Sequence, residues 1–191
     1  MKTILFVGVP LGVAFACRNV TRVSQSSNPF RDLYAIELSK EEASLLAKAS
    51  AEGLRQPIQL FASAFFRSLP FGLERLVLLV VTRTWNSNSE LFSSSWEKQN
   101  VAGIFNVIEK GPENVALSFS FDSGATIGGI SRLAVKGSRL EFGSELSKGV
   151  DPGAVPSFFH GLYSRMLLAG AKFKLMRDAQ HVVEAAANRK T

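Results

Sequence analysis

The fold is decided by residues 104–147, which read IFNVIEKGPENVALSFSFDSGATIGGISRLAVKGSRLEFGSELS. Apolar and polar residues alternate in four segments of this stretch, which is typical of strands with one buried face. The segments span 104–109, 114–121, 125–136 and 138–147, and Gly, Pro, Asp and Ser lie at the breaks between them. Connections this short hold no crossover, so the pattern predicts four neighbouring antiparallel strands.

One face of the predicted sheet is apolar and must be covered. The cover that follows in the chain is a long helix, predicted from Asp151 and Pro152 to about Ala187. Gly170, near its middle, predicts a close approach of another backbone. One stripe of this helix carries the residues Phe159, Tyr163, Met166, Gly170 and Phe173.

The residues before the sheet predict one strand and three helices. The strand is 33–38, and Ser39 with Glu42 forms the capping-box pattern of a helix over 40–52. Two further helices are predicted over 57–67 and 70–84, each begun by a proline. The polar residues 86–100 are interpreted as a loop, and Gly128-Gly129 within the third segment of the meander as a bulge. The fold class is therefore α+β, with a curved antiparallel sheet wrapped on a long C-terminal helix.

The segment 158–168 reads FFHGLYSRMLL and resembles the closing-helix motif H-x-x-Y-S-R-x-L-L of an uncharacterised family of START-like domains. Residues 140–146 resemble the F-G-S strand of that family, and 61–79 are similar to its early helices. The resemblance covers about residues 32–177, while the polar insert at 86–100 departs from it. It implies a START-like (SRPBCC) helix-grip fold and a cavity between sheet and helix, without a known reaction.

The cavity implied by this resemblance has a hydrophobic wall. An aromatic pocket with few polar groups suits a lipid, isoprenoid, pigment or polyketide. The alternative is that the same residues fill a solid core, as in a non-catalytic assembly or scaffold protein. No cofactor is expected. The predicted ligand-binding residues are Phe105, Val107, Leu117, Phe119, Phe121, Leu133, Leu140, Phe142, Ser144, Tyr163 and Met166.

A catalytic alternative uses two residues of the closing helix. His160 and Tyr163 are one turn apart, so their side chains can lie close together. A histidine can act as general acid or base near neutral pH, while a tyrosine orients a carbonyl or enolate. This would suit the cyclisation or dehydration performed by polyketide cyclases of the superfamily. A structural role for both residues is the stronger interpretation. Arg165 is expected to pair with Glu141 or Glu145, and the alternatives are that it is solvated or that it binds an anion.

The first 29 residues have the composition of a targeting leader. Lys2 precedes an uncharged stretch over 3–16 that ends in Ala-Phe-Ala, the pattern of a secretory signal peptide. The basic, Ser-rich segment 18–28 follows, so the two in series resemble the bipartite leader of plastid proteins in algae with secondary plastids. A plain signal peptide and an uncleaved apolar terminus are the alternatives. We expect an exported or organellar protein with one domain over 30–191.

Charge and metal-ligand content exclude several classes of function. The formal net charge is +6, but four of these units lie in residues 1–31, which contain no acidic residue. The remaining chain is close to neutral, so electrostatics give little reason to expect nucleic-acid binding. One cysteine and two histidines argue against a structural zinc site. Lys172, Lys174 and Arg177 make the end of the chain mildly basic, which would allow contact with an acidic membrane surface.

Overall fold

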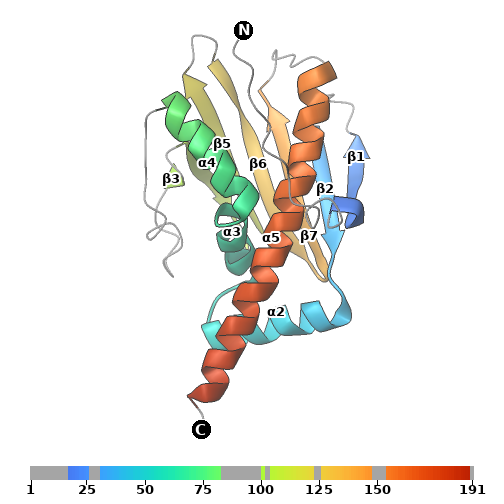
Figure 1. Cartoon of the computed structure of the whole chain (residues 1–191), viewed down its shortest axis with the longest axis vertical. Helices are drawn as coiled ribbons and strands as arrows, with labels where there is room; N and C mark the ends of the chain where they lie inside the picture. The colour runs from blue at the N-terminus through green and yellow to red at the C-terminus, as the bar shows by residue number, and fades with distance from the viewer. Residues whose placement is uncertain are drawn as a thin grey trace.

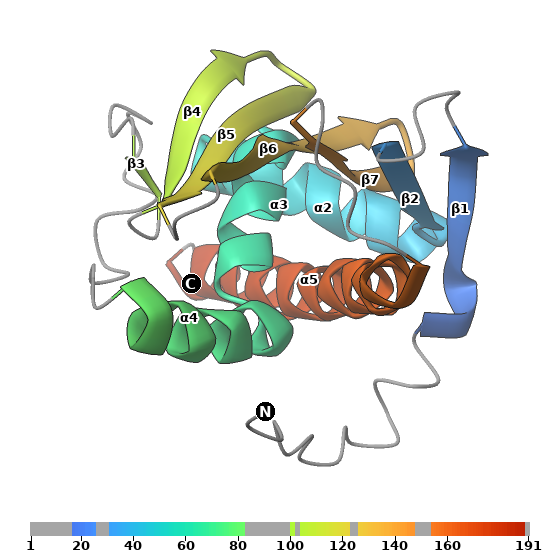
Figure 2. The ribbon, with the colours of Figure 1, turned by 90° about the horizontal axis from the view of Figure 1, so that it is seen from above.

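The computed structural model describes residues 17–25, 31–82, 100–101, 104–122, 126–147 and 154–189. Seven strands form one sheet in the order β1-β2-β7-β6-β5-β4-β3 (Figures 1 and 2). The strands are β1 (Val20–Gln25), β2 (Arg31–Glu37), β3 (Asn100–Val101), β4 (Phe105–Lys110), β5 (Asn114–Asp122), β6 (Thr126–Lys136) and β7 (Arg139–Leu146). The helices are η1 (Cys17–Asn19, a 3-10 helix), α2 (Lys40–Gly53), α3 (Pro57–Phe66), α4 (Leu69–Thr82) and α5 (Ala154–Asn188).

The predicted four-stranded meander is confirmed. Strands β4 to β7 follow one another in the sheet, and each pairs antiparallel with the next. Strand β2 pairs antiparallel with β7, which places the early strand beside the last one. The predicted bulge at Gly128-Gly129 is wrong, because the pairing of β5 with β6 runs without a shift through both glycines.

The long helix α5 lies along one face of the sheet, and α2 crosses α5 near one end of that helix (Figure 1). Helix α4 runs beside α5 on the side away from β1 (Figure 2). A close approach does occur at Gly170, but the neighbour is a side chain and not the predicted backbone: a Cβ there would lie 2.7 Å from Cδ of Pro70 at the start of α4. The fold is thus the predicted α+β helix-grip arrangement, with α3 and α4 beside the grip.

The helix starts follow local chemistry. The Ser39 hydroxyl accepts from the Glu42 N–H at 3.2 Å, and the Glu42 carboxylate accepts from the Ser39 N–H at 2.8 Å, so the predicted capping box is present. Helix α3 begins at Pro57 and buries three phenylalanines, Phe61, Phe65 and Phe66, against the sheet and α5. These three rings therefore lie in the interior of the molecule, between α3, the sheet and α5.

Strand β1 lies within the segment assigned to the leader. It pairs antiparallel with β2, and Val20 is buried in the core. Residues 1–16, with the apolar stretch and its Ala-Phe-Ala end, lie outside the described residues, so the leader stays a prediction. Cleavage in front of Cys17 would keep the sheet whole, whereas cleavage at residue 29 would remove its edge strand.

Two of the basic side chains of α5 are paired within the fold. Lys172 lies 2.7 Å from the Glu42 carboxylate, and Lys174 forms an i,i+4 ion pair with Asp178. These partners reduce the positive charge on this face. Within the part of the chain that the structure describes, no helix has the length and hydrophobicity needed to cross a membrane.

Candidate functional site

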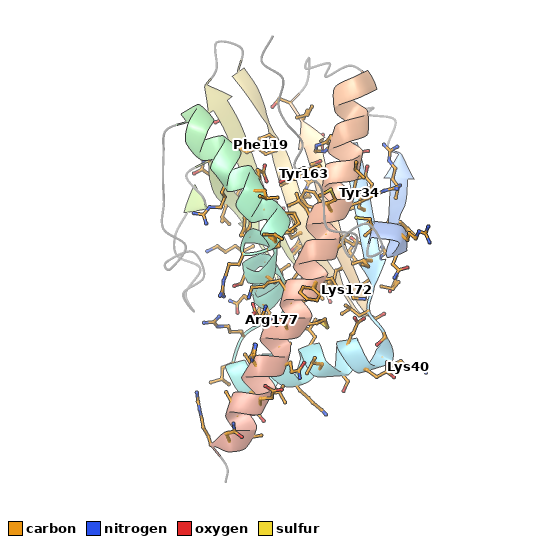
Figure 3. The ribbon with its side chains drawn as sticks, viewed as in Figure 1. Tyr34, Lys40, Phe119, Tyr163, Lys172 and Arg177 are labelled. Carbon is orange, nitrogen blue, oxygen red and sulfur yellow. The ribbon has the colours of Figure 1, made fainter. Side chains whose placement is uncertain are left out.

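An aromatic cavity lies between the sheet, helices α3 and α4, and α5. Its volume is about 240 Å³. Phe119 of β5 and Tyr163 of α5, which belong to its wall, are labelled in Figure 3. The described lining residues are Phe65, Phe66, Phe71, Glu74, Phe105, Leu117, Phe119, Ser131, Leu133, Phe142, Ser144, Leu146, His160, Tyr163 and Leu167.

The aromatic wall is a connected set of ring contacts. The Phe65 ring centroid lies 4.9 Å from that of Phe142 on β7, which joins α3 to the sheet. Phe66 contacts Phe105 at 5.6 Å, and Phe105 contacts Phe119 at 5.9 Å. Edge-to-face and tilted pairs at these distances are favourable beyond their buried area. The wall is therefore held by contacts between α3 and several strands.

Glu74 and Tyr163 form one polar group in this wall. The Tyr163 hydroxyl donates a hydrogen bond to the Glu74 carboxylate, joining α5 to α4. Burial raises the pKa of the Glu74 carboxyl, and the hydrogen bond from Tyr163 partly offsets this rise. Burial also raises the pKa of the Tyr163 hydroxyl, and the adjacent Glu74 charge raises it further. Tyr163 therefore stays protonated at neutral pH and acts as a donor.

Ser144 and His160 form a second polar group. Ser144 Oγ lies 2.6 Å from Nε2 of His160, which joins β7 to α5. Much of the His160 residue is exposed, while Nε2 is turned inward to the serine. Desolvation of the ring lowers the pKa of His160, and the charge of Asp32 acts in the opposite direction. The imidazole is therefore neutral near neutral pH.

Most of the predicted wall residues lie at the cavity. Those that line it are Phe105, Leu117, Phe119, Leu133, Phe142, Ser144 and Tyr163. Leu140 is fully buried in the core instead, Val107 packs against the core cluster, and Met166 is half-buried on α5 away from the lining set. The side chain of Phe121 lies outside the described residues. His160, predicted as a catalytic candidate, reaches the cavity with Tyr163, but each has a different hydrogen-bond partner.

Several lining residues were missed by the sequence analysis. Glu74 is the one acidic residue of α4, whose sequence LPFGLERLVLLVVT is otherwise largely apolar. An acidic residue within a largely apolar helix was the available signal for it. The phenylalanines of α3 and α4 that line the cavity, such as Phe65 and Phe71, follow the same apolar pattern as ordinary core residues. The sequence therefore does not distinguish them as cavity residues.

The expected pairing of Arg165 with Glu141 or Glu145 is wrong. The Arg165 guanidinium lies over the ring of Tyr34 on β2, 5.8 Å from its centroid. Glu141 pairs instead with Lys136 at 3.0 Å and with Arg139. Tyr34 packs beneath this turn of α5, and a Cβ on Gly161 would lie 2.8 Å from the Tyr34 hydroxyl oxygen. The Arg165 side chain is therefore directed toward β2.

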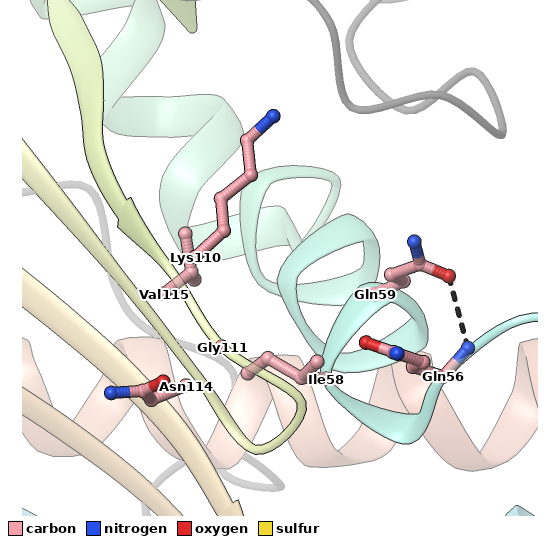
Figure 4. Close-up of a pocket in the computed structure, with 7 residues that line it drawn as sticks. All are labelled: Gln56, Ile58, Gln59, Lys110, Gly111, Asn114 and Val115. Atoms are coloured by element: carbon pink, nitrogen blue, oxygen red, sulfur yellow. Dashed lines mark hydrogen bonds between the residues drawn. The ribbon is translucent and has the colours of Figure 1, made fainter.

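Two other hollows are more polar than the aromatic cavity. One, of about 210 Å³, lies where the turn between β4 and β5 meets the start of α3 (Figure 4). Gln56, Gln59 and Asn114 are among its lining residues, and the Gln59 side chain accepts from the Gln56 N–H at 2.9 Å. The other, of about 470 Å³, lies between the ends of α2 and α5, and charged or polar side chains such as Glu52 and Arg55 share its lining with apolar ones such as Leu60 and Val182. In neither hollow do polar groups lie within a wall of aromatic rings.

Comparison with known proteins gives no relative from which to carry over a function. No family model, curated protein or solved structure matches this chain. Within the described ranges, no group of three or more His, Cys, Asp or Glu side chains is placed to hold a metal ion. The START-like resemblance stays a prediction carried by residues 158–168, and the site is argued from its own geometry.

Proposed function

We propose that this protein binds a small hydrophobic molecule with one hydrogen-bonding group in the cavity between the sheet and α5. The observation that carries the proposal is the pair Glu74 and Tyr163 within a wall of phenylalanine rings. Ligand pockets typically combine an apolar lining with a few polar groups that orient the ligand. Ser144 and His160 supply a second set of such groups.

Glu74 is partly buried, and this argues against a core that serves packing alone. Removing a carboxyl group from water costs free energy unless its partners compensate, and Glu74 receives one hydrogen bond, from Tyr163. An apolar side chain of similar size would fill the same place without that cost. A role in contacting a ligand accounts for a carboxyl group at this position better than the scaffold alternative, in which the core is simply filled.

The size of the cavity restricts the ligand. At about 240 Å³ it is smaller than the roughly 300 Å³ at the lower end of ligand pockets. This volume favours a compact molecule over a long lipid or a pigment. The small volume is also what the filled-core alternative predicts, so the two must be separated by experiment.

A proton-transfer enzyme is the second candidate. Tyr163 is a neutral donor, which suits hydrogen bonding to a carbonyl or enolate oxygen, and neutral His160 can accept a proton. Both side chains line the cavity. The binding proposal is preferred because it needs only the wall and its polar groups, whereas catalysis needs a defined substrate position between them.

Filling the cavity tests the binding proposal. We use 2-naphthol as the ligand, because it is compact, aromatic and fluorescent and carries one hydroxyl group. Ser131 lines the cavity from β6, so Ser131→Leu should fill part of it and weaken 2-naphthol binding by at least about tenfold. Ser118 lies on the opposite face of β5, and Ser118→Leu should leave the affinity unchanged. The measurement is a fluorescence titration of each purified protein.

The result that contradicts the proposal is specific. Wild-type protein that shows no saturable binding of 2-naphthol, or equal binding by both variants, would favour the filled core. Thermal unfolding of Ser131→Leu serves as the folding control, because adding a leucine to free space should leave the melting temperature unchanged or raise it.

A further inference from the structure

The charged side chains that line the cavity are unevenly distributed between acidic and basic residues. Among the described residues that line it, none is a lysine or arginine, and Glu74 is the acidic one. The shift in the Glu74 pKa has burial and the Tyr163 hydrogen bond as its causes, and no cation among the described residues contributes to it. Arg75 follows Glu74 in α4 but is not one of the described lining residues. Within the part of the chain that the structure describes, the carboxyl group therefore faces the cavity without a basic partner.

The rest of the wall is suited to a positive charge. The π faces of aromatic rings attract cations, and the attraction grows when the cation is removed from water. Tyr163 places a ring beside Glu74, and Phe71 of the same helix α4 lies in the same wall. His160 and Tyr163 are the other titratable groups in the described lining, and in their neutral forms neither repels a cation.

We propose that the ligand of this cavity is a small organic cation, a hydrophobic amine or quaternary ammonium compound, held by Glu74 and the surrounding aromatic rings. This inference rests on the proposed binding function. A cation supplies the charge partner that Glu74 lacks, and so offsets the cost of burying the carboxylate. An anionic ligand would be repelled by the ionised carboxylate, and a neutral ligand would supply no charge partner that favours the ionised form over the protonated one.

A matched pair of ligands tests this selection. Benzyltrimethylammonium and neopentylbenzene have nearly the same shape, and they differ in a nitrogen cation against a neutral carbon. Each is added to a complex of wild-type protein and 2-naphthol at neutral pH, and displacement is followed by fluorescence. The cation should displace 2-naphthol with at least about tenfold higher affinity than the neutral compound.

Variants of Glu74 locate the effect. Glu74→Gln keeps the shape and removes the charge, so the preference for the cation should disappear. Glu74→Asp keeps the charge and should retain a preference. A preference that persists unchanged in Glu74→Gln would overturn the assignment to this carboxylate. The comparison of the two ligands on wild-type protein tests the proposal by itself if the glutamine variant does not fold.

The outcomes separate this inference from the function beneath it. Neopentylbenzene that binds wild-type protein as tightly as the cation overturns the cation inference and leaves the binding proposal intact. Failure of 2-naphthol and of both other compounds to bind overturns the two together.

Discussion

Phe65→Ala should lower the free energy of unfolding by about 3–5 kcal/mol, the range for removing a buried phenylalanine ring. Phe65 is 3% exposed, and its ring lies 4.9 Å from Phe142 and 5.3 Å from Phe66 between centroids. Contacts with Phe61 and Phe71 complete its surroundings. The substitution removes contacts between α3, α4 and β7 at once and leaves a void beside the cavity, which the neighbouring rings can fill only in part. Urea unfolding of both proteins gives the difference.

Phe173→Ala is the matched control for this loss. Phe173 is 73% exposed on α5, so its removal should change stability by less than about 0.5 kcal/mol. If the two variants were destabilised equally, or Phe65→Ala lost less than about 1 kcal/mol, Phe65 would not hold the aromatic wall together.

Gly129→Ala should destabilise the protein by about 1–3 kcal/mol and weaken 2-naphthol binding. A Cβ at this position would lie 2.3 Å from the carbonyl oxygen of Glu145 on β7 and 2.6 Å from Cζ of Phe119. The first neighbour is backbone and cannot move without disturbing the strand pairing. The second is a ring of the cavity wall, so relieving the overlap changes the space that the ligand occupies.

Gly128→Ala separates this effect from the general cost of a methyl group in β6. Its Cβ would approach the Phe119 carbonyl oxygen at 3.1 Å and the Ser147 hydroxyl at 3.3 Å, which needs shifts of only tenths of an ångström. The variant should lose less stability than Gly129→Ala and bind 2-naphthol normally. Chemical denaturation and the fluorescence titration measure both effects, and equal behaviour of the two variants would contradict this packing.

Elements with a strong hydrophobic periodicity were predictable from the sequence. Elements whose conformation depends on pairing with another segment of the chain were not. Alternation over 114–121 describes a single face of a single element, so the sequence alone carries it. The predicted stripe of α5 is wrong at Phe173, because its side chain is 73% exposed and does not face the sheet. Strand β1 lies within the basic, Ser-rich segment 18–28, which also fits a leader, and its strand conformation depends on pairing with β2. Strand β3 is two residues long and is defined by its pairing with β4. Gly128-Gly129 looked like a bulge because the ring of Phe119 that requires a glycine lies on another strand.

The candidate site was predictable to a similar degree. The walls on β4 to β7 follow from which residues alternate inward, and Tyr163 follows from the helix stripe. The partnership of Tyr163 with Glu74 joins residues 89 positions apart and depends on how α4 lies against α5. The contact of His160 with Ser144 likewise depends on where β7 passes beneath α5. Local patterns predict which face a residue occupies, and tertiary packing decides its partner.

A methyl NMR titration with 2-naphthol tests most directly whether the cavity between sheet and α5 binds a ligand. Leu117, Leu133 and Leu167 line the cavity, whereas Leu46 and Leu175 are equally buried but do not line it. The account predicts saturable shifts of the three cavity methyl groups, with the two core leucines unchanged. Shifts confined to exposed leucines such as Leu54, or no shifts at all, would contradict it.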